Sequence, residues 1–118
     1  MKNNILKTEF INEKTILLYE ELDNDKISVI MRYIKDRKTV DVYLSIITKD
    51  EYLEGNCVRI NEDSTALALF RNINNQEVLE RFFYLNNYST VASDFLDLAY
   101  NDTFKNSKVN EDLILIKK

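Results

Sequence analysis

Three carboxylates and a lysine are the residues of this sequence that most suggest a catalytic site. Asp36 and Lys38 match an acid-x-Lys pattern, and Asp23 and Asp25 lie one predicted hairpin earlier. Metal-dependent nucleases use such a set, in which carboxylates hold Mg²⁺ and the lysine stands beside the attacked phosphate. Here Asp36 and Lys38 fall in a predicted turn, where nothing holds them in a productive geometry. We therefore expect a protein that is not an enzyme.

Other catalytic and metal-binding chemistries have less support. The chain has no His, so the single Cys57 has no base to activate its thiol. Residues 23–25 begin like a calcium loop, but Ile34 stands where that loop needs its bidentate Glu. One Gly and no Pro leave no glycine-rich phosphate loop. We expect no catalytic residue, no bound metal and no cofactor.

The composition predicts a single domain over residues 1–118. Hydrophobic residues make up 45% of the chain and charged residues 31%, which suffices for a core and argues against disorder. The longest apolar run, residues 66–70, is far short of the about 20 residues that a membrane span needs. Glu9 and Glu13 interrupt any N-terminal signal segment, and a lone Cys57 suits a reducing compartment. We therefore expect a cytoplasmic protein without membrane contact.

Period-two alternation predicts the elements that must position any site. Asp23 to Asp25 and Lys35 to Lys38 read as turns, because Asn and Asp tolerate the conformations that turns require. Residues 4–11 are ambiguous between strand and helix. Around the turns, the alternation predicts an antiparallel meander of about five strands at 14–22, 27–34, 39–47, 57–60 and 65–71.

After residue 73 the spacing of apolar residues becomes helical. Asn74 and Glu77 suggest a capping box that begins a helix over 74–85. Ser89 or Thr90 would begin a second helix, with Val91, Phe95 and Leu98 facing inward. The apolar run 113–116 reads as a strand returning to the middle of the sheet. Strands followed by helices favour an α+β fold, with the helix pair on one face of the sheet.

The opposite face of that sheet is the strongest candidate binding surface. It mixes aromatic, aliphatic and charged residues on neighbouring strands, as protein interfaces do. Its expected members are Leu17, Tyr19, Ile30, Arg32, Asp41, Tyr43 and Ser45. An ordinary half-solvated sheet would carry similar residues. The residues that we expect to bind a partner are Tyr19, Asp23, Asp25, Arg32 and Tyr43.

The charge distribution indicates what kind of partner to expect. Twenty acids against 16 bases leave a formal charge of −4, which argues against direct binding of nucleic acid. Acidic residues cluster near the first turn, at Glu20, Glu21, Asp23 and Asp25. Such a cluster is usually a solvated surface, but it also attracts basic proteins and accelerates their association. We expect one specific protein partner, and a homodimer is left open.

Size, acidity and missing catalytic groups favour a small protein-binding inhibitor. Two kinds fit equally: an immunity protein that neutralises a toxin, and a phage anti-defence protein. Either would occlude an active or nucleic-acid-binding site of a basic toxin or nucleic-acid-processing effector. The alternative is a small-molecule-binding domain with a pocket between sheet and helices. The residues expected to line that pocket are Phe82, Phe83, Tyr84 and Tyr100.

Overall fold

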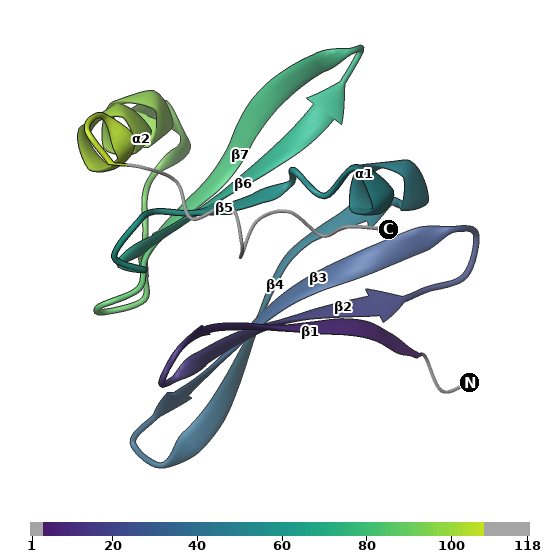
Figure 1. The fold of residues 1–118 in the computed structure, drawn as a ribbon, viewed down its shortest axis with the longest axis horizontal. Coiled ribbons are helices and arrows are strands. Elements are labelled where there is room, and N and C mark those ends of the chain that lie inside the picture. The colour runs from purple at the N-terminus through teal and green to yellow at the C-terminus, as the bar shows by residue number, and fades with distance from the viewer. Residues whose placement is uncertain (1–3, 108–118) are drawn as a thin grey trace. The chain divides into compact units, whose positions relative to one another are not determined.

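The computed structural model describes residues 4–107, and the chain has an α+β fold built from two four-stranded antiparallel sheets (Figure 1). The sheets belong to two compact units, Met1–Tyr52 and Leu53–Lys118. The expected α+β class is confirmed, whereas the expected single meander of about five strands is wrong. That residues 1–118 act as one domain stays a prediction.

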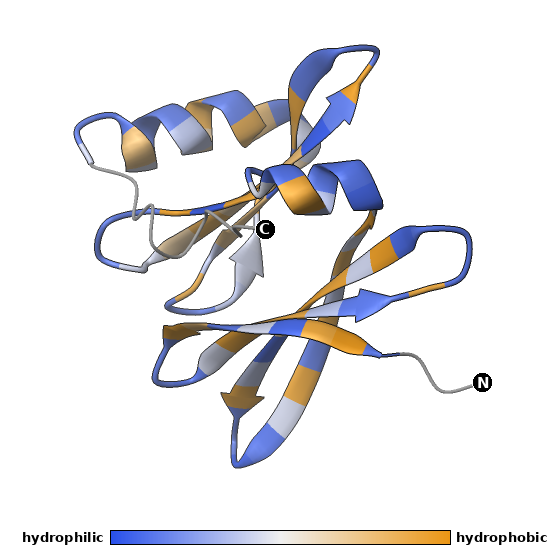
Figure 2. Cartoon of the chain, turned by 45° about the vertical axis from the view of Figure 1, so that its right-hand side comes forward, coloured by the Kyte–Doolittle hydropathy of each residue, from blue (hydrophilic) through white to orange (hydrophobic). Residues whose placement is uncertain are grey.

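The first sheet is a meander in the order β1-β2-β3-β4. The strands predicted at 14–22, 27–34 and 39–47 correspond to β2, β3 and β4, and the ambiguous residues 4–11 form most of β1. Apolar and polar residues alternate along much of these strands (Figure 2), because successive side chains point to opposite faces. The strands are β1 (Ile5–Asn12), β2 (Thr15–Glu21), β3 (Lys26–Lys35) and β4 (Lys38–Thr48).

A short helix, α1 (Lys49–Glu54), ends the first meander. Thr48 Oγ1 accepts a hydrogen bond from the Glu51 N–H at 3.1 Å, and Glu51 Oε1 accepts one from the Thr48 N–H at 2.9 Å. This reciprocal pair is a capping box, which satisfies backbone donors at the start of the helix. Gly55 follows with φ of 77°, the left-handed conformation common after a helix. The chain thus leaves the first sheet after β4, and β5 begins a second sheet.

The second sheet has the order β5-β6-β7-β8 and is followed by a helix. Its elements are β5 (Val58–Ile60), β6 (Ala66–Ile73), β7 (Gln76–Tyr84), β8 (Ser89–Thr90), the 3₁₀ turn Ser93–Phe95 and α2 (Leu96–Phe104). The strands predicted at 57–60 and 65–71 correspond to β5 and β6. α2 packs on one face of this sheet, in a core formed by Ala66, Ala68, Phe70, Phe82, Leu96, Ala99 and Phe104.

The helix predicted over residues 74–85 is wrong, because this segment is strand β7. Asn74 and Asn75 have φ of 52° and 64°, so they form the turn of a β-hairpin and not the start of a helix. Glu77 pairs with Arg59 on β5 and caps nothing. Pairing along the whole of β6 overrides the local helical spacing, since each strand then satisfies the other's backbone groups. The expected helix pair is therefore absent from residues 4–107.

The other C-terminal predictions also need correction. A helix does follow Ser89 and Thr90, but α2 begins later, at Leu96, and buries Leu96, Ala99 and Phe104. Phe95 and Leu98, expected to face inward, are exposed. The buried positions 96 and 99 each lie one residue after the expected positions 95 and 98, and one residue corresponds to about 100° around the helix. The strand predicted at 113–116 lies outside the described residues.

Candidate functional site

The register of the first sheet gathers aromatic, aliphatic and charged side chains on one face. Arg32 on β3 pairs with Ile16 on β2 and with Asp41 on β4, and Ile16 also pairs with Phe10 on β1. Residues that pair directly across strands share a face of the sheet. We call this surface the Arg32 face. Its central members are Thr8, Phe10, Ile16, Leu18, Ile30, Arg32, Asp41, Tyr43 and Ile46, and Glu20, Ser28 and Ile34 lie on the same face nearer its ends.

A bidentate salt bridge lies within the Arg32 face. Arg32 Nε donates to Asp41 Oδ1 at 2.7 Å, and Arg32 Nη2 donates to Asp41 Oδ2 at 2.9 Å. These hydrogen bonds hold the pKa of Asp41 below its ordinary value of 3.8, and the same contact raises the pKa of Arg32. Bidentate geometry fixes the plane of the guanidinium. The pair is therefore neutral as a unit and holds Arg32 in one orientation.

Large apolar side chains around this pair are exposed. Phe10 is 64% exposed and Tyr43 65%, and Ile46 is about half exposed at 52%. Leu18 and Ile30, between them in the register, are buried. Aromatic residues and Arg are enriched in the buried centres of protein interfaces. A protein that covers this surface must remove water from both charges, but the bidentate contact offsets part of that desolvation cost because neither charge is left unpaired.

Tyr19, predicted as a partner-binding residue of the same face, lies on the opposite face and is fully buried. It pairs with Val29 on β3, whereas Arg32 pairs with Ile16. Its ring lies 5.5 Å from that of Tyr52, centroid to centroid. The prediction grouped Leu17 and Tyr19 with Arg32 because alternation marks two faces of each strand but not which faces match between strands.

Ser45 was also assigned to the wrong face. The β3–β4 pairing shifts between Val29, opposite Ser45, and Ile30, opposite Tyr43, so that Leu44 is an extra residue on β4. Such a bulge reverses the alternation of the residues beyond it. Ile46 is consequently exposed on the Arg32 face.

Asp23 and Asp25 are exposed but are not neighbours of Arg32. Both lie in the connection between β2 and β3, where Asp25 has φ of 57°. Arg32 is six residues beyond the start of β3, about 20 Å along the strand. Of the five predicted residues, the sheet thus brings Arg32 and Tyr43 together, leaves the two aspartates at one end, and buries Tyr19.

The candidate nuclease residues are separated by the length of β3. Asp36 and Arg37 form the turn after this strand, and Asp25 precedes it. A ten-residue strand spans about 33 Å, so the carboxylates cannot share a metal ion. Within residues 4–107, no group of three or more His, Cys, Asp or Glu side chains is placed to hold a metal.

The aromatic residues of the proposed ligand pocket do not face a common space. Phe82 and Phe83 are successive residues of β7 and point to opposite faces. Phe82 packs against Tyr84 and Phe104, at ring distances of 5.1 and 6.3 Å, and Tyr100 stacks on Phe104 at 4.6 Å. Phe82 and Phe104 belong to the core beneath α2 and Tyr100 packs against that core, whereas Tyr84 is exposed.

The central members of the Arg32 face that the sequence analysis missed are Thr8, Phe10, Ile16, Leu18 and Ile46. The pattern of β1 does not alternate cleanly, so nothing local assigned Phe10 to a face. Ile46 was misassigned because a bulge leaves no mark in the alternation of a single strand.

Comparison with protein-family models, with curated proteins and with solved structures found no match to this chain. In the part of the chain that the structure describes, no helix is long and apolar enough to cross a membrane.

Proposed function

We propose that this chain is a small protein-binding inhibitor that docks onto one protein partner through the Arg32 face. The observation that carries the proposal is the exposure of Phe10, Tyr43 and Ile46 around the paired Arg32 and Asp41. These side chains stand on paired strands, so little backbone entropy is lost when a partner covers them. A sheet surface of this kind supplies rigid aromatic anchors.

Charge at one end of the face favours a basic partner. Asp23 and Asp25 are exposed there, beside Glu20 and Glu21. Carboxylates at the rim of an apolar interface steer the encounter with a positively charged surface and contribute mainly to the association rate. A toxin, or an effector that processes nucleic acid, presents such a surface at its active or substrate-binding site. Occlusion of that site would make the chain an immunity protein or a phage anti-defence protein.

The test uses matched pairs of exposed residues. Phe10→Ala with Tyr43→Ala removes two anchors of the face, whereas Phe95→Ala with Leu98→Ala removes two side chains of similar exposure near and on α2. The wild-type chain and the α2 control should capture the same protein from the source cells and inhibit its activity in a purified assay. The face variant should lose both. Equal capture and inhibition by the face variant would refute this assignment.

A further inference from the structure

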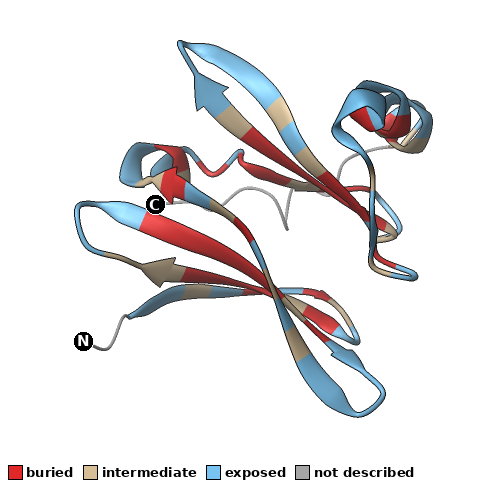
Figure 3. Cartoon of the chain, turned by 180° about the vertical axis from the view of Figure 1, so that it is seen from behind, coloured by how far each residue is buried: buried red, intermediate tan, exposed pale blue. Residues whose placement is uncertain are grey.

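The two ends of the first sheet carry opposite charge. The end formed by the β2–β3 connection has Glu20, Glu21, Asp23 and Asp25 against Lys26, a net charge of −3. The end formed by the β1–β2 and β3–β4 turns has Lys14, Lys35, Arg37 and Lys38 against Glu13 and Asp36, a net charge of +2. Exposed residues dominate both ends, and the tip of the β3–β4 hairpin is fully exposed (Figure 3).

Between these ends the Arg32 face is apolar and neutral. Arg32 and Asp41 cancel each other, and Phe10, Tyr43 and Ile46 are exposed around them. The surface therefore has a positive end, an uncharged apolar middle and a negative end. A surface with this order is complementary to a copy of itself turned end to end.

We infer that the Arg32 face is covered by a second copy of this chain when no other partner is bound. The two faces pack with a two-fold axis that lies between them and runs across the strands. This axis places β4 over β4 with the strand direction reversed, so the negative end of each copy meets the positive end of the other. A two-fold axis parallel to the strands would instead bring like charges together at both ends. Face-to-face packing of sheets with nearly aligned strands is a common arrangement.

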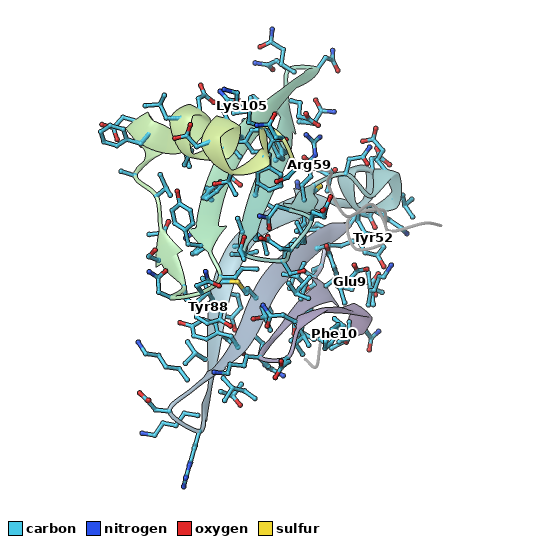
Figure 4. All side chains as sticks on the ribbon, turned by 60° about the vertical axis from the view of Figure 1, so that its left-hand side comes forward. Glu9, Phe10, Tyr52, Arg59, Tyr88 and Lys105 are labelled. Carbon is cyan, nitrogen blue, oxygen red and sulfur yellow. The ribbon has the colours of Figure 1, made fainter. Side chains whose placement is uncertain are left out.

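Dimerisation by pairing of two β1 edge strands is less favourable than packing through the Arg32 face. Glu9 lies on this edge strand, is buried, and forms an ion pair with Lys7 at 3.0 Å (Figure 4). An inward-pointing charge on an edge strand is a known protection against edge-to-edge pairing, because extending the sheet would bury the charge further. Phe10, the next residue along β1, points to the Arg32 face. The dimer contact is therefore expected at the Arg32 face and not at the β1 edge.

The size of the face predicts a weak dimer. Four strands of about eight residues measure roughly 26 Å by 19 Å, or about 500 Å² for each copy. Stable complexes bury about 800 Å² for each partner. We expect a dissociation constant in the micromolar range, which a tighter protein partner would overcome. This role of the dimer as a resting state rests on the proposed function, whereas the dimer itself does not.

The test reverses the charge at each end separately. Glu20→Lys with Asp23→Lys makes both ends positive, and Lys35→Glu with Lys38→Glu makes both ends negative. These four positions avoid the left-handed residues Asp25 and Arg37, where substitution would strain a turn. Sedimentation velocity over a range of concentrations, at low and high salt, measures the association.

The wild-type chain should dimerise, and each variant alone should do so at least about tenfold more weakly at low salt. An equimolar mixture of the two variants should recover wild-type affinity, because opposite charges then meet at both ends. The apolar middle is tested by the variants described above: Phe10→Ala with Tyr43→Ala should weaken the dimer, and Phe95→Ala with Leu98→Ala should not.

A wild-type chain that stays monomeric at hundreds of micromolar would overturn this inference, as would a dimer that neither charge reversal nor loss of Phe10 and Tyr43 weakens. Both results are separable from the proposed function. A monomer that still captures and inhibits a protein through the Arg32 face refutes the dimer alone. A dimer that captures nothing through that face refutes the inhibitor alone.

Discussion

Two tyrosines of the same sheet should respond to truncation in opposite ways. Tyr19 is fully buried and contacts the ring of Tyr52, whereas Tyr43 is 65% exposed on the other face. We expect Tyr19→Ala to destabilise the protein strongly and Tyr43→Ala to leave it nearly unchanged. The comparison tests the register of the first sheet, which decides which residues can reach a partner.

The expected magnitudes follow from burial. Truncating a fully buried aromatic ring to Ala costs about 3–5 kcal/mol of unfolding free energy, which includes the cavity that remains. An exposed substitution costs about 0.5 kcal/mol or less, and lost cross-strand contact with Ile30 adds a few tenths. For a chain of this length, about 4 °C of Tm accompanies each kcal/mol. Tyr19→Ala should therefore lower the Tm by about 12 °C or more, and Tyr43→Ala by about 4 °C at most.

Urea unfolding followed by far-UV circular dichroism is the assay, since the chain has no Trp to report by fluorescence. Tyr19→Phe is the matched control, because it keeps the ring in the core and should lose less than half as much stability as Tyr19→Ala. A cost of Tyr19→Ala under about 1 kcal/mol, or a cost of Tyr43→Ala equal to that of Tyr19→Ala, would refute this register. Either result would contradict the assignment of Tyr19 to the buried face and of Tyr43 to the exposed face.

Three further predictions concern stability. Asn61 is buried, and its Oδ1 accepts hydrogen bonds from the N–H groups of residues 65 and 66 at 2.9 and 2.8 Å. Asn61→Ala should therefore lower the unfolding free energy by about 1–3 kcal/mol in a urea titration. The control Asn86→Ala, at an exposed position, should change it little. Thr48→Ala removes half of the capping box and should cost about 1 kcal/mol in the same titration; no measurable loss would show that the box does not stabilise α1. The lowered pKa of Asp41 means that its pair with Arg32 stabilises the fold above pH 3.8 and that this contribution is lost as the pH falls through the lowered pKa. Asp41→Asn should accordingly lower the unfolding free energy by up to about 1 kcal/mol near pH 7, a small value because both side chains are partly exposed. The loss should be smaller at about pH 2, and a loss that grows on acidification would contradict the pairing.

Several elements were predictable because their signals are local. The strands at 14–22, 27–34 and 39–47 show period-two alternation between polar turns, and they correspond to β2, β3 and β4. The turn at Asp36 and Arg37 was predicted from residue type alone. The Thr48–Glu51 capping box was equally legible, as a Thr followed three residues later by a Glu, although it was overlooked.

The candidate site was only partly predictable, because its membership depends on pairing between strands. Arg32, Asp41 and Tyr43 were grouped correctly. Tyr19 was wrongly added, and Phe10 was missed, because neither the β2–β3 register nor the position of β1 can be read from a single strand. The segment 74–85 has a spacing that suits a helix, and only its long-range pairing with β6 makes it a strand.

The sequence by itself determined where most strands begin and end, the acidic balance, and the opposite charges of the turns that bound the first sheet. These properties depend on residues close together in the chain. The tertiary structure alone decided that there are two sheets, that residue 82 lies on a strand, and that Tyr19 is buried while Phe10 and Tyr43 are exposed. A one-residue change of register turns every side chain of a strand to the other face, so an interface built from several strands exists only after they have paired.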